Sequence, residues 1–223
     1  MIFDADDTLW ENNILFVRVI EDYLDWVAHP TLSRTEIKRL LLDIEVANIA
    51  TRGYGSAAFL DNLAECLERL RERPASEAER RHLDVLAAEL LRHEVVLMPD
   101  VAGTLAALGR RHRLLLLTKG APDEQQRKID ASGLVDHFAA VHIVAEKTPA
   151  VYTRLVAQHA LAPEATWMIG NSPRSDIIAA RAAGLNAVFI PHHATWELEQ
   201  AELDPDDASV LVLSGIGELL HHF

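Results

Sequence analysis

Short apolar runs alternate with helical patterns through the second half of the chain. The runs are RLLLLT, AVHIVA, ATWMIG, NAVFIP and SVLVLS, and segments such as DVAGTLAALGRRH and SPRSDIIAARAAG separate them. Continuous apolar runs of this length suit strands that are buried on both faces, and their alternation with helices is typical of a parallel sheet. The opening residues IFD read as a further strand. The pattern therefore predicts an α/β fold built on a doubly wound parallel sheet.

A helical pattern fills the stretch between the first strand and the others. From about Asn13 to Val96, apolar residues recur at three-and-four spacing, and the breaks in this pattern contain proline or glycine. This block interrupts the α/β pattern just after its first strand. We therefore predict an α/β catalytic core of residues 1–10 and 98–223, and an all-helical cap domain of residues 11–97.

Composition restricts the partners and the compartment. The 223 residues are 49% hydrophobic and carry a formal net charge of −13, which repels polyanions, so we expect neither nucleic acid nor an anionic membrane surface as a partner. The single cysteine, Cys66, cannot form an intramolecular disulfide. No basic segment precedes an apolar run at the N-terminus, and no window reaches the roughly 18 apolar residues of a membrane span. We expect a soluble cytoplasmic protein, whose oligomeric state the sequence leaves open.

Three carboxylates crowd directly behind the first strand, in the segment FDADDTLW. Asp4 and Asp6 alternate in an extended segment, so their side chains point the same way. Two like charges about 4 Å apart repel by roughly 4 kcal/mol at the effective dielectric of a protein surface. A Mg²⁺ ion would offset this cost, because it prefers one or two carboxylates together with water and phosphate oxygens.

The other strand ends carry complementary groups. Thr118 lies at the tip of LLLLTKG, Lys147 follows the third run in AEKTPAVY, and Asn171 and Asp176 follow the fourth in WMIGNSPRSD. Ligands bind where the carboxyl ends of parallel strands converge, so we expect these side chains to meet Asp4. Such a set would hold a hard divalent metal with an oxyanion beside it.

Together these segments resemble the motifs of phosphatases of the haloacid dehalogenase superfamily. DADDTL resembles the nucleophile motif of that family, LLLLTKG its threonine motif, EKTPAVY its lysine motif and IGNSPRSD its acidic metal motif. The helical block matches the family's cap in position and helical character. The resemblance implies a Mg²⁺-dependent phosphohydrolase that cleaves a small phosphorylated metabolite, a phosphomonoester, through an aspartyl-phosphate intermediate.

The resemblance also implies a role for each matching residue. Asp4 would be the nucleophile, and Asp6 would protonate the leaving oxygen and then activate water. Thr118, Lys119 and Lys147 would bind the phosphoryl oxygens as charge is redistributed. The metal ligands would be Asp4, the backbone carbonyl of Asp6, Asn171 and Asp176.

Two positions depart from the family's usual pattern. Asp7 stands where glycine is common, and Asn171 stands where many members have aspartate. Because Asn171 keeps a carbonyl oxygen but loses a charge, we expect a functional, weaker metal site in which Asp176 is the main anionic partner. The strand before Asp4 is also short, only Met1 to Phe3, as a chain lacking some N-terminal residues would show.

Two further segments allow more than one interpretation. The glycines of TRGYGSAAF permit a turn that carries Arg52 or Tyr54 over the site as substrate-binding residues, or a plain helix connection with Tyr54 half buried. His192 and His193 follow the fifth apolar run near the same edge, where they either line the pocket or lie in a surface loop.

Other functions fit the same fold. A 2-haloacid dehalogenase also uses an aspartate nucleophile, but it needs neither a leaving-group acid nor a metal, so Asp6 argues against it. A phosphotransferase or mutase would pass the phosphoryl group to an alcohol, which a cap that excludes water would favour. A non-catalytic ligand-binding scaffold remains a further alternative, because a fold does not guarantee activity. The sequence does not identify the physiological substrate.

Overall fold

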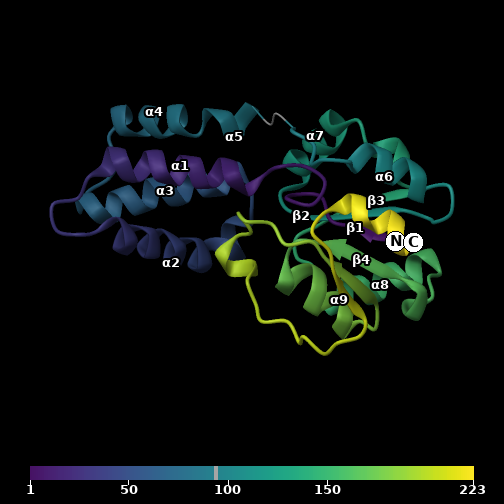
Figure 1. Cartoon of the computed structure of the whole chain (residues 1–223). Helices are drawn as coiled ribbons and strands as arrows, with labels where there is room; N and C mark the ends of the chain where they lie inside the picture. Colours follow the sequence, from purple (N-terminus) through teal and green to yellow (C-terminus); the bar gives the residue numbers. More distant parts are fainter. Residues whose placement is uncertain (93–94) are drawn as a thin grey trace. The chain divides into compact units, whose positions relative to one another are not determined.

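The computed structural model describes residues 1–92 and 95–223 (Figure 1). The chain forms two compact units, one of Met1–Asn13 with Val95–Phe223 and the other of Ile14–Glu94. The α/β unit thus extends three residues further at each junction than the sequence-based boundaries. The backbone explains this extension: the N–H of Glu11 donates to the carbonyl of Val96 at 2.9 Å, and the N–H of Met98 donates to the carbonyl of Leu9 at 2.9 Å.

A parallel sheet forms the centre of the α/β unit. Within the described residues it has six strands in the order β3-β2-β1-β4-β5-β6, and each adjacent pair is parallel. Although β1 has only two residues, it lies between β2 and β4, with Ile2 in register with Leu115 and Met168. The predicted doubly wound α/β fold is confirmed. The strands are β1 (Ile2–Phe3), β2 (Leu115–Lys119), β3 (Ala140–Val144), β4 (Trp167–Gly170), β5 (Asn186–Phe189) and β6 (Val210–Val212).

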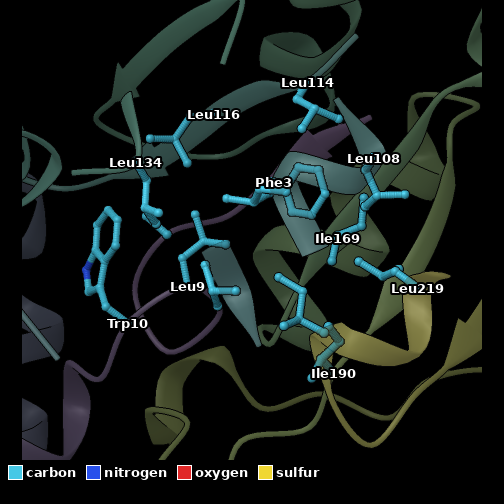
Figure 2. Packing of buried hydrophobic residues seen from close by; sticks show 14 of the residues in the cluster. Phe3, Leu9, Trp10, Leu108, Leu114, Leu116, Leu134, Ile169, Ile190 and Leu219 are labelled. Carbon is cyan, nitrogen blue, oxygen red and sulfur yellow. The ribbon is translucent and has the colours of Figure 1, made fainter. Parts of the chain in front are cut away.

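Helices cover both faces of the sheet, and side chains alternate between them. Phe3 points into a cluster that contains Leu108 of α6 and Leu219 of α10 (Figure 2). Its neighbour Ile2 points to the opposite face, where it shares a cluster with Tyr152 of α8. This burial on both faces explains why the strands read as continuous apolar runs. The helices are α6 (Val101–Leu108), α7 (Pro122–Ser132), α8 (Pro149–His159), α9 (Ala179–Ala182) and α10 (Leu219–His222).

The inserted unit is helical and has its own core. Its apolar cluster includes Tyr23, Ile44 and Leu67, all fully buried or nearly so. Ser33 and Ser76 form capping boxes at the starts of α2 and α4. Within the described residues, none of the helices has the length and apolar character that a membrane span requires. The helices are α1 (Asn13–Val27), α2 (Arg34–Arg52), α3 (Ser56–Arg71), α4 (Glu77–Leu86) and α5 (Ala88–Arg92).

Candidate active site

Asp4 lies in a buried cluster at the carboxyl ends of the strands. It follows β1 directly, and its N–H donates to the carbonyl of Ile169 in β4 at 2.9 Å. Lys147 follows β3, and its ammonium donates to Oδ1 of Asp4. The same ammonium donates to Oδ1 of Asp176 at 2.7 Å. The side chains of Asp4, Lys147 and Asp176 are 8%, 3% and 0% exposed. The structure therefore brings together three residues that the sequence places behind three different strands.

The cluster carries more negative than positive charge. Burial, followed by the charge of Asp4, raises the pKa of Asp176 to about 7, although Lys147 acts in the opposite direction. Burial lowers the pKa of Lys147, but its two carboxylate partners outweigh this effect and hold the pKa above its ordinary value. The lysine is therefore charged, and above about pH 7 two carboxylates share one ammonium. This excess of negative charge suits a nearby cation.

The turn after β4 delivers Asp176 to the cluster. Gly170 ends the strand, and a Cβ at that position would lie 2.2 Å from Oδ2 of Asp176, so only glycine leaves room for the carboxylate. The N–H of Ser172 donates to the same oxygen at 3.0 Å. Residues Pro173–Ile178 then form a π-helical turn, a feature that occurs often at functional sites. The local sequence thus fixes the carboxylate by both space and hydrogen bonding.

Asn171 and Thr8 flank Asp4. The hydroxyl of Thr8 donates to Oδ2 of Asp4 at 3.0 Å. In the orientation that gives both amide atoms partners, the Asn171 nitrogen lies 3.2 Å from the Asp6 carbonyl and 3.3 Å from Oδ2 of Asp4, while its oxygen accepts from Thr195 at 3.0 Å. This orientation is assigned from the hydrogen-bond pattern. A carboxylate oxygen and a backbone carbonyl therefore converge beside the Asn171 amide, and oxygens of this kind fit Mg²⁺. In the opposite amide orientation, Oδ1 of Asn171 lies on the same side, where it accepts from the hydroxyl of Thr8 at 3.3 Å.

Asp6 is held by side chains that the sequence analysis did not identify. Lys128 donates to both oxygens of Asp6, at 2.7 and 2.8 Å. The indole N–H of Trp10 donates to Oδ1 at 2.7 Å, and the amide of Gln125 donates to Oδ2 at 3.0 Å. The Lys128 side chain is 9% exposed, which is unusual for lysine. One signal was available: on a helix, Gln125 and Lys128 share the face of Ile129, the apolar residue of this segment.

Thr118 joins the same network, whereas Lys119 has a different partner. The Gln125 amide donates to the hydroxyl of Thr118 as well as to Asp6, so it links the end of β2 to the segment after β1. The Lys119 ammonium forms an ion pair with Glu199. The substrate-binding role of Lys119 stays a prediction, and substrate would have to compete with this carboxylate.

Arg52 and Tyr54 belong to the helical unit, whereas Asp4 belongs to the α/β unit. Arg52 donates to Asn62 at 3.0 Å and to Glu65 at 2.8 Å, both on α3. Tyr54 is partly exposed in the turn between α2 and α3. Their contact with substrate stays a prediction.

Fold and site together define a class of α/β enzyme in which a buried aspartate after the first strand is paired with a lysine from another strand end. The family model of the haloacid dehalogenase-like hydrolases matches residues 1–184. The chain therefore belongs to the haloacid dehalogenase-like hydrolase family, as the four sequence motifs indicated.

Individual relatives agree on the family and differ in activity. A phosphoserine phosphatase from Thermus thermophilus is 33% identical over 121 residues, which are 52% of this chain and 48% of that protein, so the match spans about half its length. A haloacid dehalogenase-like family hydrolase from Xanthomonas campestris has a TM-score of 0.85 at 26% identity, covering 99% of this chain and 92% of that one. An L-2-haloacid dehalogenase from Xanthobacter autotrophicus, at 19% identity, shares the fold with a TM-score of 0.64, covering 99% and 96%.

Proposed function

We propose that the protein is a Mg²⁺-dependent phosphohydrolase that cleaves a small phosphomonoester through an aspartyl-phosphate on Asp4. The observation that carries the proposal is a second ordered carboxylate: Asp6 is 22% exposed and is held by Lys128, Trp10 and Gln125. A dehalogenase reaction needs only the nucleophile, whereas an alkoxide leaving group needs a proton. The phosphoserine phosphatase from Thermus thermophilus supports the same choice.

In the first step, an oxygen of Asp4 attacks phosphorus, and the bond between phosphorus and the ester oxygen breaks. Asp6 gives its proton to that oxygen, so the leaving group departs as an alcohol. Lys147 and the hydroxyl of Thr118 bind the phosphoryl oxygens as charge is redistributed on them. The buried position of Lys147 makes its charge more effective than the same charge in water.

In the second step, Asp6 is a carboxylate and takes a proton from water. The water oxygen attacks phosphorus, and the bond from phosphorus to the Asp4 oxygen breaks, which releases phosphate and regenerates Asp4. Lys128 favours the ionised form of Asp6, because its ammonium donates to both carboxylate oxygens. We infer that Lys128 prepares Asp6 for this second step.

The residues that would hold Mg²⁺ are Asp4, the carbonyl of Asp6, Asp176 and Asn171, whose amide would turn its oxygen toward the metal. When bound, the metal neutralises charge on the phosphoryl oxygens and orients the ester. Both oxygens of Asp176 already accept hydrogen bonds, from Lys147 and from the N–H of Ser172. Each oxygen keeps a further lone pair, so in our proposal Asp176 is the main anionic partner of the metal beside Asp4. The neutral amide of Asn171 makes the site weaker than one with a third carboxylate ligand.

The substrate we propose is a small phosphorylated metabolite, with phosphoserine as the first compound to test. Neither nucleic acid nor a membrane surface is proposed as a partner, because the formal net charge is −13. We place the activity in the cytoplasm, because a single cysteine allows no intramolecular disulfide of the kind that oxidising compartments favour.

The test is phosphate release from an aryl phosphate and from phosphoserine, with Mg²⁺ and then with EDTA. We expect release that needs the metal and that Asp4→Asn abolishes. Asp123→Asn, an exposed carboxylate at the start of α7, is the matched control and should retain activity.

Metal-independent halide release from a 2-haloacid would replace the proposal with a dehalogenase. Transfer to an added alcohol without phosphate release would replace it with a phosphotransferase, and silence over a broad panel would favour a scaffold.

A further inference from the structure

A second cluster of ligating side chains lies outside the cluster of Asp4, Lys147 and Asp176. Asp7 and Glu11 follow β1, and His192 follows β5, all within the α/β unit. Each offers one ligating atom, and these atoms lie within 4.8 Å of one another. The proposed phosphatase chemistry uses none of the three.

The ring nitrogens of His192 are buried, and none of the described residues gives them a hydrogen-bond partner. The His192 side chain as a whole is 10% exposed. Nε2 lies 3.2 Å from Oε2 of Glu11, an atom that is also buried without a hydrogen bond. Nδ1 lies 3.7 Å from Oδ1 of Asp7, too far for a hydrogen bond. Buried polar groups are ordinarily paired, so this arrangement indicates a missing partner.

The spacing suits a shared metal ion. Ligand atoms about 2.0 to 2.2 Å from a tetrahedral metal lie about 3.3 to 3.6 Å apart. The 3.2 Å between His192 and Glu11 is close to this value, although the two groups are not aligned as a hydrogen bond. The carboxylate of Asp7 is already fixed, because Oδ1 accepts from the N–H groups of Asn12 and Asn13 at 2.9 and 3.0 Å.

The chemistry of the groups selects the type of ion. Burial lowers the pKa of the His192 imidazole, although Glu11 opposes this, so the ring is neutral, as a ligand must be. The other two ligands are carboxyl groups; burial raises the pKa of Asp7 to about 7, and a bound cation would favour its charged form. An imidazole nitrogen suits Zn²⁺ and its neighbours in the first transition row, whereas Mg²⁺ favours oxygen ligands alone.

We propose that Asp7, Glu11 and His192 form a second metal site that takes a divalent first-row transition ion such as Zn²⁺. The ion would pair Oε2 of Glu11 with one ring nitrogen of His192, and it would join the segment after β1 to the loop after β5. It is separate from the Mg²⁺ site proposed at Asp4.

The test is binding of Co²⁺ to the full chain after removal of metals, followed by visible absorption and calorimetry. With Mg²⁺ in excess to occupy the site at Asp4, we expect one Co²⁺ whose absorption bands report a nitrogen ligand and which Zn²⁺ displaces. His192→Ala and Glu11→Gln should each weaken this binding at least tenfold. Glu11→Gln keeps the size of a side chain that is 33% exposed, so it carries the test if His192→Ala does not fold.

Two controls separate this site from others. His193→Ala, an exposed neighbour, and Asp4→Asn should leave Co²⁺ binding unchanged. Unchanged binding in Glu11→Gln would overturn the proposal, as would its loss in His142→Ala, because His142 faces His159 elsewhere in the unit. The test needs no phosphate release, so it stands or fails separately from the proposed function.

Discussion

Lys147 is the residue on which the site's electrostatics depend. It is the only ammonium that the described residues place against both Asp4 and Asp176, and it is almost fully buried. Removing one partner from a buried ion pair leaves uncompensated charge, which is more costly than losing a surface pair. The cluster thus joins stability to the proposed chemistry.

Lys147→Met should lower the free energy of unfolding by about 3 to 5 kcal/mol, because two buried carboxylates lose their shared cation. Urea unfolding in EDTA at pH 8 measures the change. Asp176→Asn in the same chain should recover part of the loss, since it removes one of the stranded charges. If the effects of the two substitutions on the free energy of unfolding simply add, the coupling inferred from the distances is wrong.

Lys128 is expected to act through Asp6 and not on the substrate itself. Lys128→Met should lower kcat by about tenfold to hundredfold, less than the full contribution of about 10² to 10⁴ typical of a general acid or base, with KM little changed. The basic limb of the kcat/KM profile should move to higher pH, because Asp6 is the proton donor of the first step and its carboxylate form loses a charged partner. Gln126→Ala, an exposed neighbour on α7, is the control. An unshifted pH profile would assign Lys128 a purely structural role.

At the scale of the element, the junction between β4 and the π-helical turn determines where Asp176 lies. Gly170→Ala would place a Cβ 2.2 Å from Oδ2 and 2.7 Å from Cβ of Asp176. We expect kcat/KM for phosphate release to fall by about a hundredfold or more while the sheet remains folded, because the carboxylate must move off Lys147. Gly215→Ala is the matched control, since a Cβ there meets nothing within 4 Å. Equal activity of the two variants would contradict the requirement for glycine.

The packing of β3 against α8 includes a histidine pair. Nε2 of His142 lies 2.7 Å from Nε2 of His159, so one nitrogen must donate and the other accept. Burial, followed by the charge of His159, lowers the pKa of His142. The stability that the neutral His142 contributes is therefore present above the ordinary histidine pKa of about 6.5, and it is lost as pH falls below that value.

His142→Gln should consequently reduce the loss of stability between pH 8 and pH 5. Urea midpoints at the two pH values measure the effect. His221→Gln, on an exposed part of α10, should keep the wild-type dependence. The interpretation fails if both variants respond to pH as the wild type does.

At the scale of the molecule, the two chain segments that lead into and out of the helical unit are hydrogen-bonded to each other. Trp10 and Leu97 form an antiparallel bridge, which holds the two ends of the insertion near each other. Replacing residues 14–94 with a short Gly/Ser linker should therefore leave an α/β unit that folds and unfolds cooperatively, as circular dichroism and urea unfolding would show. Replacing α7 in the same way should abolish cooperative unfolding, because it removes Ile129 from the core. A linker variant without a cooperative transition would show that the α/β unit needs the helical unit.

The sequence by itself determined the sheet and the residues at its strand ends. Apolar runs buried on two faces leave few alternatives to a parallel sheet, and parallel strands direct their carboxyl ends to one edge. This is why the sequence alone predicts that Asp4, Lys147 and Asp176 lie close together. Only the tertiary structure decided that Lys128 holds Asp6 and that His192 faces Glu11. These contacts join segments more than a hundred residues apart, and their distances depend on helix packing and loop paths that no local pattern encodes.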